Sequence, residues 1–258
     1  MKKLHIVITV LLFVLGVTCY IVFEAVHIKL VEDPIANNLL CGFISRYVLS
    51  ILFVWLLYMF GGRDYLLFNK KFFKMVIWSL PCFMVAFINF PYSAVIGGAV
   101  TIDRMDLMGL YIIYIISIAL LEELIFRGVL LVLAKDYLKN TRHAPLWITL
   151  ICAAIFSLFH LTNLFMDGAL IPILVQCVYT FLIGAMLIVT MLKLKNIWLC
   201  ILIHAIFDFG GMIVISGLAS NDPHDAVFWV LTIVSGLLCA GHIIYSLIKL
   251  DKDYASRS

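Results

Sequence analysis

Charged residues are scarce in this sequence. Asp, Glu, Lys and Arg make up 13% of the 258 residues, whereas hydrophobic residues make up 65%. A soluble domain carries about 25% charged residues, so this composition excludes a soluble globular protein and is typical of a chain that crosses a membrane several times. The net charge of +3 is concentrated in loops and predicts no nucleic acid as a partner.

Paired cysteines are also missing. The chain has 7 cysteines, an odd number, and no C-x-x-C motif. They are scattered singly, mostly within apolar runs: Cys19, Cys41, Cys82, Cys152, Cys177, Cys200 and Cys239. We interpret them as buried free thiols rather than a disulfide framework or a metal cluster.

Long apolar runs predict an all-α membrane protein, a bundle of about eight transmembrane helices, since about 20 apolar residues span a bilayer. The predicted spans are 4–23, 39–60, 75–90, 107–133, 146–165, 172–192, 197–215 and 226–248. Residues 1–258 then form a single polytopic domain. We expect Pro81 to kink the third span and Arg46 to snorkel from the second to the outer interface.

The loops between these spans alternate in charge. Residues 61–74, 134–145 and 193–196 are net basic, whereas 24–38, 91–106 and 216–225 are net acidic. Basic loops stay in the cytoplasm, so the pattern predicts that both termini are cytoplasmic. We expect a multi-pass protein of the cell membrane, a bacterial plasma membrane, in contact with membrane lipid.

The segment 122–128, EELIFRG, places two carboxylates and a guanidinium in an apolar run. Each charge at the bilayer centre costs at least ~2.5 to 3.5 kcal/mol on insertion scales, and such groups usually pair or have a function. Glu123 and Arg127 are i and i+4 on one helix face, while Glu122 points about 100° away. We therefore expect Arg127 to hold Glu123 and Glu122 to remain free to react.

Two further motifs lie at a similar depth, Phe156-x-x-x-His160 and His204-x-x-x-Asp208. At a rise of ~1.5 Å per residue, Glu122, His160 and Asp208 lie ~16 to 21 Å from the cytoplasmic helix ends and His204 ~10 Å. This combination suggests hydrolysis, with a carboxylate as general base and an imidazole that shares the proton or binds a metal. The second histidine and the aspartate could stabilise an oxyanion, orient the first pair or complete a metal site.

The three motifs EELIFRGVL, FSLFH and HAIFD, in this order on the fourth, fifth and seventh spans, resemble those of the CAAX-processing and bacteriocin-processing (CPBP, or Abi) family of intramembrane proteases. That family is related to the eukaryotic Ras-converting CAAX protease. The resemblance covers residues 107–215, which we expect to be the catalytic core. It implies a glutamate-dependent peptidase of eight helices whose membrane cavity opens towards the cytoplasm.

By position, the resemblance implies that Glu122 and His160 activate water, that Glu123 and Arg127 support them, and that His204 and Asp208 form the oxyanion side. Position 208 is Asp where the Ras-converting members have Asn, and an aspartate is a poorer oxyanion donor but a better metal ligand. The cofactor therefore stays open: none, or a divalent metal such as zinc. Its candidate ligands are Glu122, His160, His204 and Asp208.

Signatures of other intramembrane proteases are absent: H-E-x-x-H of site-2 zinc proteases, G-x-S-x-G of a rhomboid-like serine site and G-x-G-D of presenilins. The predicted function is an intramembrane endopeptidase for a hydrophobic or membrane-associated peptide, such as a prenylated CAAX-like tail, a bacteriocin leader or a signal-peptide precursor. The alternative is a catalytically inactive member acting as an immunity or regulatory membrane-binding protein. A proton-coupled transporter lacks an internal repeat and paired interrupted helices.

Simpler roles remain for individual residues. Glu122, Glu123 and Arg127 could be an ion-pair cluster that only joins helices, and His160 a packed bundle histidine. Phe156 and Phe159 are expected to pack. Gln176, Tyr179 and His242 belong to no motif, and we expect them to form hydrogen bonds between helices.

Overall fold

The computed structural model describes Val14, Thr18 and residues 28–67, 71–166, 169–221 and 224–255. The predicted first span, 4–23, therefore falls almost entirely outside the described residues. The described chain is mainly helical, with these elements in order: α2 (Pro34–Met59), η1 (Arg63–Leu66), α3 (Phe72–Trp78), α4 (Leu80–Ile88), α5 (Tyr92–Ile96), β1 (Thr101–Ile102), η2 (Met105–Leu107), α6 (Met108–Glu123), η3 (Leu124–Leu130), α7 (Leu131–Leu138), α8 (Ala144–Phe159), η4 (His160–Met166), α9 (Leu170–Leu194), α10 (Ile197–Gly211), β2 (Ala219–Ser220) and α11 (Ala226–Ala255).

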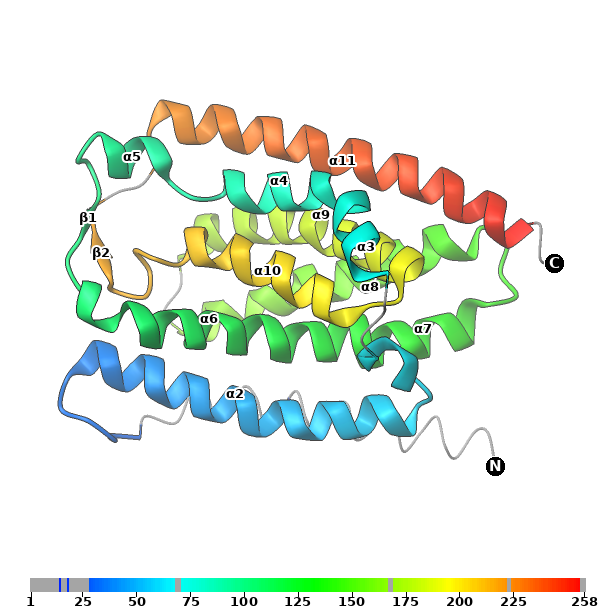
Figure 1. Ribbon diagram of the computed structural model, residues 1–258, viewed down its shortest axis with the longest axis horizontal. Helices are drawn as coiled ribbons and strands as arrows, with labels where there is room; N and C mark the ends of the chain where they lie inside the picture. The colour runs from blue at the N-terminus through cyan, green and yellow to red at the C-terminus, as the bar shows by residue number, and fades with distance from the viewer. Residues whose placement is uncertain are drawn as a thin grey trace.

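The long helices lie side by side along one axis (Figure 1). Helix α2 packs on α6, α10 lies between α6 and α4, α8 packs on α9, and α11 covers α4 and α9. Within the described residues, 4 helical segments are long and apolar enough to cross a membrane: 34–59, 144–164, 170–194 and 226–254. The chain is a multi-pass membrane protein. The other predicted spans are the broken α3–α4 pair, the continuous α6–η3–α7 run and the shorter α10.

Polar side chains cap the first turns of α2 and α10. The Asp33 carboxylate accepts a hydrogen bond from the Ala36 amide at 2.9 Å, and the Asn196 side chain accepts one from the Leu199 amide at 3.0 Å. These bonds satisfy amides that have no partner within their own helix. The Ala36 amide, together with the Arg104 guanidinium, holds the pKa of the Asp33 carboxyl below its usual range.

The position of Arg46 differs from the prediction that its side chain snorkels to the outer interface. Because α2 begins at Pro34 rather than Leu39, Arg46 lies in the middle of the helix and not near its end. It is 5% exposed, and its guanidinium lies over the Tyr114 ring of α6, 4.9 Å from the centroid. Gly42 makes this possible, since a Cβ there would collide with both Arg46 and Tyr114. The predicted snorkelling of Arg46 is wrong: a cation–π contact holds it inside the helix pair.

The third span, predicted to kink at Pro81, is divided into two helices. The break falls at Ser79, between α3 and α4, and Pro81 occupies the first turn of α4. A proline there removes no helical hydrogen bond, whereas its ring prevents the preceding helix from continuing. The Ser79 hydroxyl donates to the Met75 carbonyl at 2.9 Å, which satisfies an acceptor at the end of α3.

Several predicted boundaries differ from the structure. The fourth span continues through α7 to Leu138, so residues 134–138, predicted as loop, are helical. Helix α8 ends at Phe159, and the next residue, His160, begins the 3-10 segment η4. Helix α10 ends at Gly211, four residues before the predicted end. Apolar residues follow the end of α10, so the local sequence does not mark it.

The predicted all-α fold also contains a short β-ladder. β1 pairs antiparallel with β2, with Thr101 opposite Ser220 and Ile102 opposite Ala219. The hydroxyls of Thr101 and Ser220 are 2.8 Å apart. The ladder joins the loop before α6 to the loop after α10, and therefore fixes the ends of two helices that carry the predicted site.

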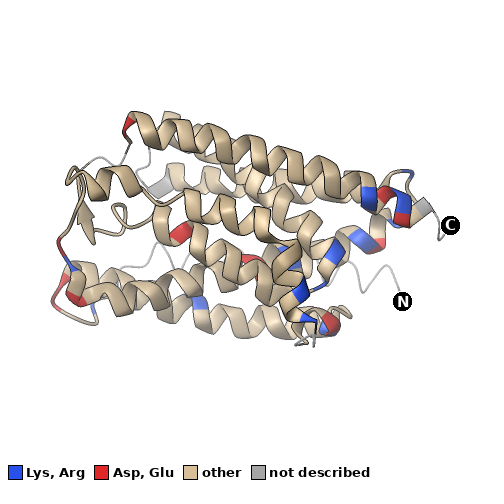
Figure 2. Cartoon of the chain, turned by 45° about the horizontal axis from the view of Figure 1, so that its top comes forward, with Lys and Arg blue, Asp and Glu red and all other residues tan. Residues whose placement is uncertain are grey.

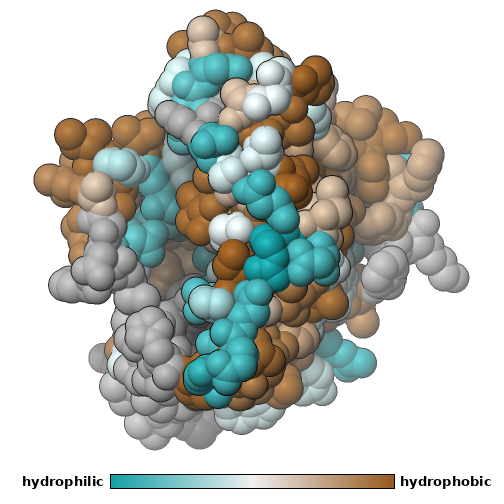
Figure 3. Space-filling view, turned by 90° about the vertical axis from the view of Figure 1, so that its left-hand side faces the viewer, coloured by the Kyte–Doolittle hydropathy of each residue, from teal (hydrophilic) through white to brown (hydrophobic). Residues whose placement is uncertain are grey.

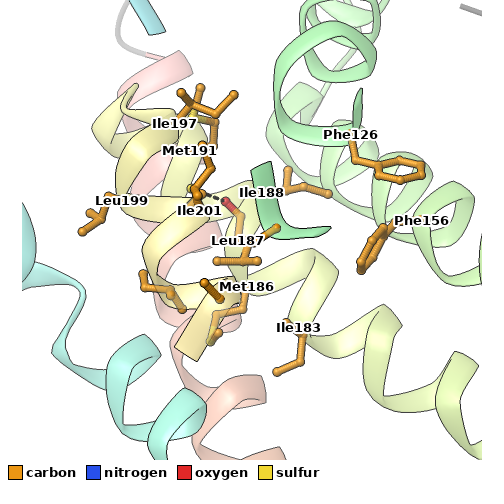
Figure 4. Close-up of a cluster of buried hydrophobic side chains, with 14 of the residues drawn as sticks. Phe126, Phe156, Ile183, Met186, Leu187, Ile188, Met191, Ile197, Leu199 and Ile201 are labelled. Atoms are coloured by element: carbon orange, nitrogen blue, oxygen red, sulfur yellow. Dashed lines mark hydrogen bonds between the residues drawn. The ribbon is translucent and has the colours of Figure 1, made fainter. Parts of the chain in front are cut away.

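The bundle core is made of aliphatic side chains with a few aromatic rings (Figure 4). Leu187, Ile188 and Met191 of α9 are buried with Ile197 and Ile201 of α10. The predicted free thiols are confirmed for the six cysteines that the structure describes, while Cys19 lies outside the described residues. Cys200, for example, donates to the Leu187 carbonyl at 3.7 Å.

The two ends of the bundle differ in charge. Most Lys and Arg residues gather at the end that holds the C-terminus (Figure 2). There α11 is attached to its neighbours by His143–Asp251 and Lys193–Asp253 contacts of 2.8 and 2.9 Å. The opposite end, with β1 and β2, carries a stripe of hydrophilic side chains flanked by hydrophobic ones (Figure 3). Polar groups thus concentrate at the two ends, as expected if the bundle axis crosses the bilayer.

The positive-inside rule predicts which end faces the cytoplasm. Alkaline phosphatase fused after Gly98, in the acidic loop, should be active, because that enzyme needs export. The same reporter fused after Lys195 should be inactive, and a fluorescent protein fused there should fold and fluoresce. The reverse pattern would contradict the predicted orientation.

Candidate functional site

The EELIFRG motif lies where helix geometry changes. Helix α6 ends at Glu123, and the next seven residues, Leu124–Leu130, form the π-helical segment η3 before α7 begins. Such π segments are rare and frequently lie at functional sites. Gly128 allows close packing here, since a Cβ at that position would lie 3.2 Å from Leu57 of α2.

Glu123 is the centre of a buried charge cluster. Its Oε1 lies 3.0 Å from Arg127 Nη1 and 2.7 Å from His204 Nδ1, and the side chains of Glu123 and Arg127 are 0% exposed. Because the Nδ1 atom faces a carboxylate already paired with arginine, it carries a hydrogen and donates it. Glu123 therefore joins η3 to α10 and determines the orientation of the His204 ring.

Arg127 is held by charge and by an aromatic ring. Its guanidinium carbon lies 4.1 Å from the centroid of the Phe156 ring on α8, a short cation–π distance. Its nitrogens have no partner of hydrogen-bond geometry among the described residues, although the 3.0 Å contact with Glu123 is an ion pair. The predicted i, i+4 pair is present and also contacts a third helix.

Glu122 and Asp208 lie on the other side of His204. His204 Nε2 is 3.3 Å from Asp208 Oδ2 and 3.7 Å from Glu122 Oε2. The Glu122 and Asp208 side chains are 11% and 15% exposed, in contrast to the sealed Glu123. Of the two adjacent glutamates, only Glu122 therefore keeps any exposed side-chain surface.

His160 begins η4 directly after α8. Its Nδ1 lies 2.9 Å from the Phe156 carbonyl, so Nδ1 carries the hydrogen and Nε2 of the neutral ring keeps its lone pair. The ring stands edge-on to Phe156, with centroids 5.0 Å apart at 88°. His204 stands edge-on to the same Phe156 ring, with centroids 6.1 Å apart. The structure thus brings together all six predicted side chains: Glu122, Glu123, Arg127, His160, His204 and Asp208.

The other single-residue predictions can also be compared with the structure. Phe156 and Phe159 pack against Phe126, with centroids 4.9 and 5.5 Å apart, which confirms their packing role. His242 lies 3.5 Å from Cys82 across α11 and α4, and Asn163 donates to Gln176 at 3.0 Å. Both residues therefore bond to other helical segments, as predicted.

Two residues near the site had no signal in the sequence. Tyr111 of α6 donates its hydroxyl to the Phe209 carbonyl at 2.7 Å, and Asn89, at the end of α4, donates to the Phe207 carbonyl at 2.8 Å. The two carbonyls flank Asp208. The only hint in the sequence is that Tyr111 lies eleven residues, about three turns, before Glu122.

The site does not fit a metal centre. In the part of the chain that the structure describes, no group of three or more His, Cys, Asp or Glu side chains is placed to hold a metal ion. Of the four candidate ligands, His204 lies between the carboxylates of Glu122 and Asp208, whereas His160 bonds to the Phe156 carbonyl. No step below depends on a metal.

An apolar groove of about 460 Å³ lies beside the cluster, between α4, α6 and α10. Its walls include Phe87 of α4, Phe90 just after α4, Ile112 of α6, and Ala205 and Phe209 of α10. Ala205 and Phe209 each follow directly after a polar residue of the site, His204 and Asp208. The groove therefore lies next to the segment of α10 that carries the site.

The buried ion pair predicts a large effect on stability. Arg127→Met leaves the Glu123 carboxylate without its cation, and we expect it to lower the free energy of unfolding by about 3 to 5 kcal/mol. The double variant with Glu123→Gln should recover part of this loss. The matched control is Lys139→Met, because Lys139 pairs with Asp136 on the surface at 2.6 Å, and its loss should cost less than about 1 kcal/mol.

Denaturant unfolding in detergent micelles measures all three variants. An Arg127→Met variant as stable as Lys139→Met would show that the pair contributes nothing. A double variant less stable than the single one would mean that Glu123 has another partner that matters more.

Comparison with known proteins gives one match. Residues 104–210 match the family described as type II CAAX prenyl endopeptidase Rce1-like. The matched stretch begins just before α6, ends within α10 and contains all three motifs. No curated protein and no solved structure matches the chain. Residues 104–210 therefore resemble the Rce1-like type II CAAX prenyl endopeptidase family, the resemblance that the three motifs predicted.

Proposed function

We propose that this protein is an intramembrane endopeptidase in which Glu122 activates a water molecule that hydrolyses a peptide bond of a hydrophobic or membrane-associated substrate. One observation carries the proposal. Of two adjacent buried glutamates, Glu123 is sealed and paired with Arg127 and His204, while Glu122 is partly exposed. The match to a family of prenyl endopeptidases supports the reaction class.

The charge arrangement supports Glu122 as the base. His204 Nε2 is 3.7 Å from Glu122, too far for a strong hydrogen bond. Glu122 therefore keeps its carboxylate oxygens available for a water molecule. A base in a site shielded from bulk water also acts where electrostatic interactions are stronger than in solution.

The reaction follows from these positions. Glu122 takes a proton from water, and the resulting hydroxide attacks the carbonyl carbon of the scissile peptide bond. The carbon–nitrogen bond then breaks, and the departing nitrogen takes the proton from Glu122. His160 assists by accepting a hydrogen bond from the same water through Nε2, which is free because Nδ1 donates to the Phe156 carbonyl. Placement of such a general base contributes about 10²- to 10⁴-fold to the rate.

His204 and Asp208 form the proposed oxyanion side. His204 donates to Glu123 through Nδ1 and, when doubly protonated, through Nε2 towards Asp208, 3.3 Å away. One proton shared between His204 and Asp208 balances the aspartate charge. When that proton is on Asp208, the carboxyl O–H can donate to the oxyanion, so aspartate at position 208, in place of asparagine, is compatible with stabilisation of a negatively charged intermediate.

The proposed substrate is a peptide with a hydrophobic or lipidated segment, such as a prenylated CAAX-like tail, a bacteriocin leader or a signal-peptide precursor. Two features support this class. The site lies inside a membrane protein, where such peptides concentrate, and the apolar groove is lined by Ala205 and Phe209, which directly follow His204 and Asp208 in α10. We propose a plasma-membrane location with both termini in the cytoplasm, and a single domain whose catalytic core is residues 107–215.

The test compares cleavage products. Native protein, Glu122→Gln and His160→Ala are purified and incubated with peptide pairs that differ only in a prenyl group, and products are identified by mass spectrometry. We expect Glu122→Gln to lower kcat about 10³-fold or more and His160→Ala about 10²-fold. Glu32→Gln is the matched control, because Glu32 is an exposed carboxylate whose partner is Lys29, and it should cleave normally.

Two outcomes would contradict the proposal. Cleavage by Glu122→Gln at the native rate would exclude Glu122 as the base. No cleavage by native protein of any prenylated, leader or signal peptide would favour the inactive, membrane-binding alternative. A metal chelator should leave native cleavage unchanged, and its loss on chelation would contradict the metal-free mechanism.

A further inference from the structure

The end of α10 is held by side chains of two other helices. The last carbonyls of a helix have no amide partner within it. Here the Tyr111 hydroxyl of α6 donates to the Phe209 carbonyl at 2.7 Å, and the Asn89 amide, at the end of α4, donates to the Phe207 carbonyl at 2.8 Å. Asp208 is thus the residue between two anchored carbonyls.

The same end of α10 also lies unusually close to the backbone of α4. A Cβ at Gly210 would lie 2.6 Å from the Phe90 Cα, and one at Gly211 would lie 2.7 Å from the Asn89 side-chain nitrogen. Only glycine fits such a close approach. The ring of Phe209 packs against Tyr111, with centroids 5.4 Å apart. The contacts restrict sliding and rotation of this end of α10.

We infer that Asn89 and Tyr111 are positioning residues for the proposed hydrolysis, acting through the α10 backbone to place Asp208 and His204 opposite the glutamates of α6. This inference rests on the proposed function for its effect on the rate. Neither side chain contacts the reacting atoms. Their effect is geometric, since a shift of the order of 1 Å in a supporting element costs up to about 10²-fold in rate.

Two contacts of α10 explain how the Tyr111 and Asn89 hydrogen bonds influence the position of the His204 ring. Asp208 follows His204 by one helical turn, and His204 Nε2 lies 3.3 Å from Asp208 Oδ2. Helix α10 also contributes Nδ1 of His204 to Glu123 at 2.7 Å. If α10 rotates or slides, both contacts change together, and Glu122 loses its neighbour His204. Tyr111 and Glu122 lie on the same helix, so the Tyr111 hydrogen bond aligns α10 directly with the helix that carries the base.

The test removes each donor with little change of shape. Tyr111→Phe deletes only the hydroxyl and keeps the ring against Phe209, and Asn89→Leu deletes the amide. Ser117→Ala is the matched control, because it deletes a buried hydroxyl of α6 that donates within its own helix, to the Tyr114 carbonyl at 2.6 Å. Two readouts are taken on the full chain in micelles: steady-state cleavage, and the ¹⁵N resonances of the His204 imidazole, assigned with His204→Gln.

We expect Tyr111→Phe and Asn89→Leu each to lower kcat about fivefold to tenfold, the effect of one hydrogen bond, with KM within about twofold. Both should shift the His204 resonances, whereas Ser117→Ala should change neither readout. His204 resonances that stay in place in both variants would overturn the inference, because the two residues would then be purely structural. The resonances are read without substrate, so a failure of the proposed protease function leaves this result intact.

Discussion

Burial of the Glu123 carboxylate is the constraint on which the rest of the site depends. A charge at this depth must be paired, because the membrane interior offers no water to solvate it. Arg127 at 3.0 Å and His204 at 2.7 Å supply the two partners, from η3 and α10. The contact fixes two helices relative to each other, and Phe156 of α8 completes it by packing under the arginine.

This arrangement gives the neighbouring glutamate a different environment. Glu122 precedes Glu123 directly, yet it contacts the other side of His204 and remains partly exposed. Two chemically identical side chains therefore differ in what they can do: one holds the bundle together, and the other can meet water. The π-helical segment begins directly after Glu123, where the helix places the two glutamate side chains on opposite sides of His204. Local irregularity at such a point is a common feature of functional sites.

Much of this site could be predicted from the sequence because its signals are local. The i, i+4 spacing within EELIFRG and HAIFD places each pair on one face, and apolar runs give the helices that bring them together. Contacts between segments far apart in sequence could not be predicted. The β1–β2 ladder, the Tyr114 ring under Arg46, and the bond from Asn89 to α10 each join residues whose proximity exists only after the helices pack.

The sequence also left open which partner orients His204. Its own helix offers Asp208 at i+4, and this contact exists at 3.3 Å, but the shorter contact is with Glu123 on α6. Tertiary packing favours Glu123 over Asp208 as the closer partner, because an unsatisfied carboxylate costs more free energy when it is fully buried than when it is partly exposed. The matched stretch contains the motifs in the predicted order, and the geometry gives the two glutamates different surroundings.

The most direct test of this separation measures stability and turnover together for two variants that each neutralise one glutamate. Glu123→Gln leaves the Arg127 and His204 charges buried without their partner, so the free energy of unfolding should fall by about 3 to 5 kcal/mol. Glu122→Gln should unfold within about 1 kcal/mol of native protein, since that side chain is partly exposed and weakly paired, and should lose cleavage. Equal losses of stability in both variants, or cleavage that depends on Glu123 but not on Glu122, would contradict the account.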